Sequence, residues 1–148
     1  MPVINNGETL SAQKVNDYLN HTQLAPVAYT PTVSNATATA SATYMRIGTR
    51  IEVEFSILFS GAASGTVAIS TPTLLSAGSV GMALGVAFGV DGGVTTTRRS
   101  FTVVGASGAA TVAFQVDSAT SAGLVNATVP WTWANTDTIV GRFTYWEA

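Results

Sequence analysis

Two kinds of residue in this sequence could carry acid–base chemistry: one histidine and a closely spaced pair of glutamates. A Ser–His–Asp triad would have to use His21, because the chain has one histidine, and no GxSxG nucleophile elbow accompanies it. Glu52 and Glu54 alternate with apolar residues in RIEVEFSILF, so they share one face of a predicted strand, about 6 to 7 Å apart. That separation overlaps the carboxylate spacing of glycosidases, but ordinary solvation of a strand face needs the same residues. No catalytic residue is therefore expected.

The aspartates are expected in turns, where their side chains accept local hydrogen bonds. Asp91, Asp117 and Asp137 all follow this pattern. A calcium site built from loop carboxylates lacks EF-hand spacing, and a chain without cysteine has no thiolate ligands. No metal and no cofactor are expected.

The aromatic residues near the end of the sequence allow two interpretations. Trp131 and Trp133 share a face of the extended segment PWTWAN, and Trp146 lies in FTYWEA. They either close one end of the core or form a platform on which a sugar ring stacks. The possible glycan contacts are Trp131, Trp133, Asn135 and Trp146.

The composition indicates a protein covered by copies of itself or by a larger assembly. Charged residues make up 9% of the 148 residues, against roughly 25% in an ordinary soluble domain. The formal net charge is −2, and Arg98 and Arg99 form the one basic pair, predicted to solvate a loop. Nucleic acid is not expected as a partner, because phosphate neutralisation needs several clustered Lys or Arg residues.

The first part of the chain predicts a helix followed by an extended linker. Thr9 can cap a helix whose apolar stripe includes Val15, Tyr18 and Leu19. Residues 1–24 either fold back onto the domain or attach it to another protein. Residues 25–40, APVAYTPTVSNATATA, predict an extended linker or edge strand. This N-terminus lacks the features of a secretory signal, which predicts synthesis in the cytosol.

Residues 41–148 predict an all-β domain. Ile51, Val53 and Phe55 begin a period-two strand with one wet face, and GAASG predicts the turn to a second strand, TVAIS. DGG at 91–93 predicts a further turn. Further strands are expected near 100–104, 111–116, 124–129 and 139–146. About eight strands of this kind are typical of an antiparallel β-sandwich or jelly roll.

The stretch VGMALGVAFGV, residues 80–90, has glycines four residues apart, as in membrane helix-packing motifs. It is too short to span a bilayer as a helix, and no membrane insertion is expected. As a strand it puts every large side chain on one face and Gly or Ala on the other. The large face is expected in the core, and the small face is expected to pack against another copy of the chain or an overlying segment such as residues 25–40. The predicted interface residues are Gly81, Ala83, Gly85, Ala87 and Gly89.

Three segments give the chain a resemblance to surface proteins of tailed bacteriophages. NNGETLSAQKVNDYLN resembles the segment that begins many minor tail and fibre proteins. AYTPTVSNATATASATYMRIGTRIEVEFSILF and VPWTWANTDTIVGRFTYWEA are similar to the first and last strands of β-sandwich modules in phage fibres and virion decorations.

The resemblance implies a non-enzymatic virion protein. It would be made in the host cytoplasm and lie on the virion surface. The first segment would attach it through Leu10, Val15, Tyr18 and Leu19, and the β-domain would project as a homotrimer. A minor tail or fibre protein touching a host surface glycan is the leading hypothesis. A capsid decoration protein and a small glycan hydrolase using Glu52 and Glu54 are the alternatives.

Overall fold

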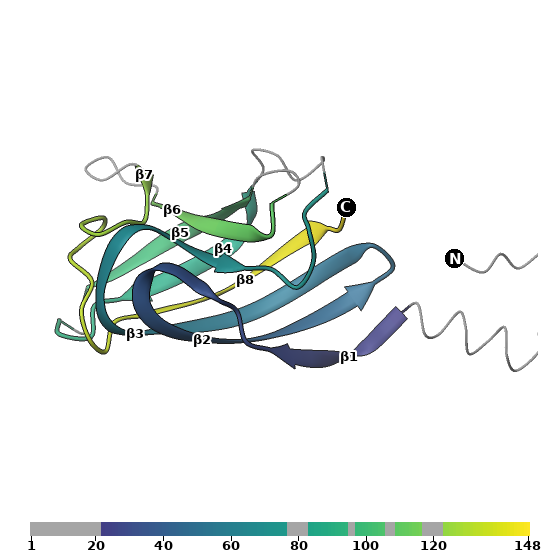
Figure 1. Ribbon diagram of the computed structural model, residues 1–148, viewed down its shortest axis with the longest axis horizontal. Helices are drawn as coiled ribbons and strands as arrows, with labels where there is room; N and C mark the ends of the chain where they lie inside the picture. The colour runs from purple at the N-terminus through teal and green to yellow at the C-terminus, as the bar shows by residue number, and fades with distance from the viewer. Residues whose placement is uncertain (1–21, 77–82, 95–96, 106–108, 117–122) are drawn as a thin grey trace, which may run out of the picture.

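The structure is a computed structural model that describes residues 22–76, 83–94, 97–105, 109–116 and 123–148 (Figure 1). All regular structure in these residues is β-strand, which confirms the predicted all-β class. The eight strands are β1 (Thr22–Tyr29), β2 (Val33–Ile47), β3 (Arg50–Ser70), β4 (Ala83–Val90), β5 (Arg98–Gly105), β6 (Thr111–Val116), β7 (Gly123–Leu124) and β8 (Thr138–Trp146).

The strands form one antiparallel sheet that closes on itself. Its order is β1-β2-β3-β8-β4-β5-β6-β7, and β6 also pairs with β3. The ring β3-β8-β4-β5-β6 is therefore a five-stranded barrel, with β2 and β1 added outside β3 and the short β7 added to β6. This closed barrel differs from the expected two-sheet sandwich because β3 pairs with β8 in its first half and with β6 at its end, which closes the ring of strands.

The length of β3 closes the barrel. Its first half, Arg50–Leu58, pairs with β8, and its last three residues, 68–70, pair with β6. The predicted turn at GAASG is wrong, because Ala63 in that segment stays paired with Ala36 of β2. Register shifts flank this pair, and small residues let the strand coil without a clash: a Cβ on Gly61 would lie 3.1 Å from Thr37 Cβ.

The predicted boundaries at residues 24 and 40 do not coincide with structural boundaries. Thr22–Leu24, expected at the end of the helix, belong to β1, and β2 begins at Val33 within the predicted linker. Along β2, alanines turn toward the core while Thr and Ser turn outward. The short alanine side chains let β2 pack against a core that is already filled. Leu10, Val15, Tyr18 and Leu19 lie outside the described residues.

The other expected elements are found with one exception. DGG forms a turn in which Asp91 Oδ1 accepts hydrogen bonds from the backbone N–H groups of Gly93 and Val94, at 3.0 and 3.1 Å. Arg98 and Arg99 begin β5 and are exposed. The strand expected at 124–129 is limited to Gly123–Leu124. Asn126 Oδ1 accepts from Thr128 N at 3.0 Å, and this side-chain turn replaces a strand pairing.

Small and large residues alternate around the inside of the barrel. At one level, paired positions run from Phe55 through Gly141 and Ala87 to Phe101. At the next level they run from Val53 through Phe143 and Gly85 to Val103. A barrel of few strands has a narrow interior. An aromatic side chain that points inward from one strand therefore requires a small residue on the neighbouring strand.

The expected orientation of β4 is wrong. Ala87 is fully buried and Gly89 is buried, whereas Val86 and Phe88 are about half exposed. A Cβ on Gly89 would lie 2.6 Å from the ring of Phe101, so the small face leaves the space that aromatic rings of other strands fill. Ala83 is exposed and Leu84 is buried because the register shifts between Ala83 and Gly85. Gly81 lies outside the described residues.

Two tyrosines in the core differ in how their hydroxyls are satisfied. Tyr145 OH lies 3.0 Å from Thr73 Oγ1 and accepts from Thr73 N at 3.2 Å. Tyr29 OH is buried and has no partner among the described residues, and its ring meets Tyr44 edge-on at 5.7 Å. Burial raises the pKa of both phenols above the usual 10.0.

Replacing Tyr29 with phenylalanine should raise the free energy of unfolding at pH 7 by about 1 kcal/mol, because it removes an unpaired buried hydroxyl. Raised phenol pKa values in the folded state give stability that is complete below pH 10 and is lost as the pH rises above 10. Tyr29→Phe should therefore also make the alkaline loss of stability shallower. Urea titrations at several pH values measure both effects.

Tyr145→Phe is the matched control, because it removes a hydroxyl that is hydrogen-bonded to Thr73. It should lower the free energy of unfolding at pH 7 by about 1 kcal/mol. Equal and destabilising effects of the two substitutions would contradict this account of Tyr29.

Candidate functional site

The outer wall of β3, β8 and β4 carries the most distinctive surface of the described residues. Cross-strand pairing sets its outward side chains in rows. One row runs from Glu54 to Arg142 to Val86, and the next from Ser56 to Val140 to Phe88. A third row runs from Leu58 to Thr138 to Val90. Charged, hydroxyl and apolar groups therefore lie next to one another on one face.

Four large apolar side chains in these rows are exposed, and we call them the apolar patch. Their exposed fractions are 50% for Leu58, 53% for Val86, 52% for Phe88 and 43% for Val140. Phe88 and Val140 are direct cross-strand partners, and a shallow hollow of about 390 Å³ lies between the patch and the Glu54–Arg142 pair. Scattered exposed apolar residues are ordinary, but contiguous ones mark contact surfaces.

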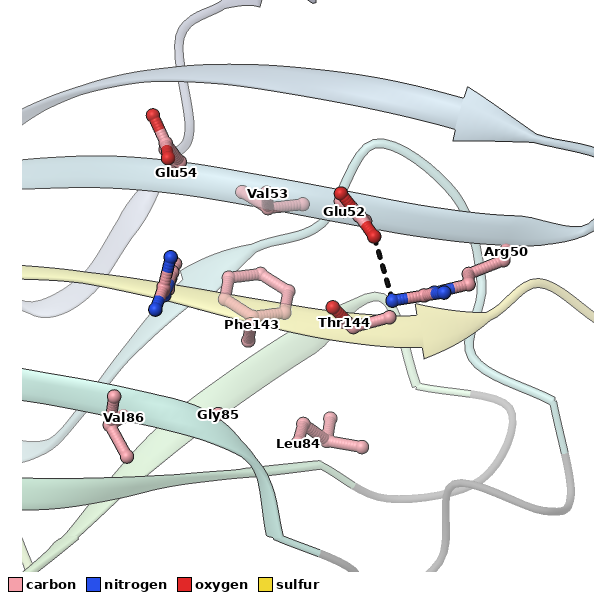
Figure 2. A pocket seen from close by; sticks show the side chains of 10 residues that line it. Arg50, Glu52, Val53, Glu54, Leu84, Gly85, Val86, Phe143 and Thr144 are labelled. Atoms are coloured by element: carbon pink, nitrogen blue, oxygen red, sulfur yellow. Dashed lines mark ion pairs between the residues drawn. The ribbon is translucent and has the colours of Figure 1, made fainter. Parts of the chain in front are cut away.

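A second hollow, of about 330 Å³, adjoins the patch and is lined in about equal parts by charged or polar residues and by apolar ones; because its charges come from two arginines and two glutamates, we call it the charged hollow (Figure 2). Arg50 points toward Glu52, and their side chains form an ion pair at 2.7 Å. Glu54 and Arg142 also line it. Two arginines and two glutamates balance, so the charged hollow favours neither a strongly anionic nor a strongly cationic ligand.

The two glutamates lie where the sequence predicts, on the outward face of β3. Glu54 is exposed, Glu52 is partly exposed, and Glu52 is held by Arg50. Such an ion pair is the usual arrangement of solvated surface charges. Both carboxylates belong to the solvent-facing side of β3 rather than to its buried side.

The tryptophans of PWTWAN close one end of the core. Trp133 is buried and stacks on Phe59, with ring centroids 4.4 Å apart, and its Nε1 donates to Val129 O at 3.3 Å. Trp131 is half-buried and packs against Trp133 at 4.9 Å. The core-closing interpretation therefore describes both, and the buried Trp133 has no face for a sugar ring.

The remaining predicted glycan contacts do not come together. Trp146 is 49% exposed at the last position of β8, opposite Arg50. Asn135 is exposed in the turn before the first residue of β8. The length of β8 separates them, so a shared sugar platform is not formed. Trp146 is the cross-strand partner of Arg50, which lines the charged hollow.

Asp137 is more than a turn residue. Its side chain is buried, and its two oxygens accept three hydrogen bonds from separate parts of the chain. Oδ1 accepts from Gly92 N at 2.8 Å, and Oδ2 accepts from Ala134 N at 2.9 Å and from Trp131 Nε1 at 3.1 Å. The carboxylate thus joins the β4–β5 turn, the turn before β8 and the indole of Trp131. The hydrogen bond from Ala134 N is the local kind expected of a turn aspartate, whereas the partner Gly92 was not visible in the sequence because it is 45 residues away.

The part of the chain that the structure describes contains no group of three or more His, Cys, Asp or Glu side chains placed to hold a metal ion. It also contains no helix with the length and apolar character needed to cross a membrane.

The chain matches no protein-family model, no curated protein and no solved structure. The function therefore has to follow from the residues of this chain and from the surface that they form.

Proposed function

We propose that this protein is a non-enzymatic structural component of a bacteriophage virion, most readily a minor tail or fibre protein that contacts the host surface. Its first segment attaches it to the particle, and the β-barrel projects as a homotrimer. Localisation at the virion surface after synthesis in the host cytoplasm follows from this role. The proposal takes its family from the sequence resemblance described above.

The observation that carries the structural role is the open outer wall of β3, β8 and β4. It presents the apolar patch beside charges that are already balanced, which suits contact between folded surfaces better than capture and conversion of a substrate. The barrel itself supports the role of a projecting module, because closure leaves few free strand edges for uncontrolled pairing.

Removing residues 1–21 should leave the barrel folded, because all eight described strands begin after these residues. It should abolish incorporation into particles, because the proposed attachment residues lie in the segment that is removed. Circular dichroism of the truncated protein measures folding, and immunoblotting of purified particles measures incorporation. Particles that still contain the truncated chain at the full level would contradict attachment through this segment.

A capsid decoration protein is the second candidate, favoured by the low charge of the chain, 9% of residues. Decorations cover a head in many copies, whereas fibres are few. Electron microscopy of virions carrying a labelled chain separates the two, since label on the tail supports the fibre and label over the head supports the decoration. Unlabelled particles would contradict both.

A further inference from the structure

We infer that the apolar patch, flanked by the charged hollow, is the surface through which one copy of this chain binds a second copy. The inference rests on the self-association in the proposed function and replaces the interface predicted from the small residues of β4. Of the residues in that earlier prediction, Ala87 and Gly89 are buried.

The position of the patch is the first reason. Leu58, Val140 and Phe88 come from three adjacent strands, β3, β8 and β4, in consecutive rows. Their backbones are fully paired within the sheet, so this wall offers side chains rather than free backbone groups. A partner must therefore lie on it face to face, as in the packing of two sheets.

The charges beside the patch identify the partner. Arg50 and Arg142 balance Glu52 and Glu54 in the charged hollow, and Glu54 and Arg142 are direct cross-strand partners. A second copy presents the same neighbouring charges, so Glu54 of one copy can meet Arg142 of the next without net repulsion. A polyanion or a strongly basic protein would meet equal attraction and repulsion here.

The chemistry of the rest of the wall agrees with a like partner. Rows next to the patch carry Ser41, Thr43 and Ser56 on β2 and β3, short side chains that lose little conformational entropy in a contact. Apolar residues at the centre with polar residues around them are typical of protein interfaces. Long lysine side chains, which disfavour such contacts, are not among the described residues of this wall.

The first test compares Phe88→Glu with Val94→Glu in the full chain. Phe88 lies in the patch, whereas Val94 is equally exposed, at 53% against 52%, but lies in the turn after β4. Light scattering coupled to gel filtration should give a multiple of 15.2 kDa for the unchanged protein and for Val94→Glu. Phe88→Glu should weaken association at least about tenfold, with an unchanged near-ultraviolet circular dichroism spectrum.

The second test keeps the inference falsifiable if Phe88→Glu does not fold. The chain has no cysteine, so Val140→Cys and Val94→Cys each introduce a single thiol. Mild oxidation should cross-link Val140→Cys between copies and leave Val94→Cys largely uncross-linked. A charge exchange adds specificity: Glu54→Arg should weaken association, and the double variant Glu54→Arg with Arg142→Glu should restore it.

A monomeric unchanged protein at its highest soluble concentration would overturn the inference, as would equal cross-linking at positions 140 and 94. These results are distinct from failure of the proposed function. A monomeric chain found in particles overturns the interface alone, whereas an oligomeric chain absent from particles overturns the virion role alone.

Discussion

Replacing Asp137 with alanine should lower the free energy of unfolding by about 4 kcal/mol. The substitution removes a buried acceptor of three hydrogen bonds and leaves Gly92 N, Ala134 N and Trp131 Nε1 without it. Hydrogen bonds to a charged group are stronger than neutral ones, and donors left unpaired in a core add their desolvation cost. Urea unfolding followed by tryptophan fluorescence measures the change, and Trp131 should also lose its fixed environment.

Asp137→Asn is the control that keeps the shape of the side chain. Its amide oxygen can still accept, but its NH₂ group would face a donor, so the loss should be about half that of alanine. A midpoint for Asp137→Ala within error of the unchanged protein would show that the three hydrogen bonds are not needed for stability.

The second large effect is expected at Ala87. Leucine at this position should lower the free energy of unfolding by about 3 kcal/mol, because overpacking a filled core forces strained rotamers or backbone shifts. Ala87 is fully buried beside Gly141 and Phe101, and even a Cβ on Gly141 would lie 2.7 Å from Ala87 Cα. Thermal or urea unfolding provides the measurement.

Ala83→Leu is the matched control on the same strand, because Ala83 is exposed. It should change stability by less than about 0.5 kcal/mol, as most surface substitutions do. The pair tests the orientation of β4 directly: if Ala83→Leu destabilises and Ala87→Leu does not, the strand faces the other way.

Strands with one polar and one apolar face could be predicted from the sequence. The alternation of Ile51, Val53 and Phe55 with Glu52 and Glu54 shows which side of β3 is buried, and the structure agrees. The predicted strand 111–116 coincides with β6. In these elements the sequence contains both the inward and the outward residues, so no distant partner is needed to orient the strand.

The orientation of β4 could not be predicted in this way, because both of its faces are apolar. Which face lies inside depends on Phe55, Phe101 and Phe143, which lie on other strands and fill the interior. Hydrophobicity favoured burying Val86 and Phe88, but the limited width of a five-stranded barrel decided against it. The same dependence on distant neighbours turned GAASG from an expected turn into a continuous part of β3.

The residues of the candidate site also differ in whether the sequence could predict their positions. Glu52 and Glu54 were placed correctly, because a single strand determines their shared face. Glu54 lies in one row with Arg142 on β8 and Val86 on β4. These neighbours come from strands that are distant in the sequence, so the sequence did not predict the row. Trp131 and Trp133 were recognised as a pair on one face of PWTWAN, but their packing in the core and the hydrogen bond from Trp131 to Asp137 appear only in the fold.

Closure of the ring has a consequence for how the molecule loses structure. The ring β3-β8-β4-β5-β6 is complete without β1 and β2, which attach to it through one edge of β3. The outer strands can therefore separate while the ring stays shut, whereas opening the ring requires one of its five strand pairings to break. Amide hydrogens should accordingly exchange with solvent in two stages, those of β1 first and those shared by β3 and β8 last. The outer strands β1 and β2 are thus expected to detach before the five-stranded ring opens.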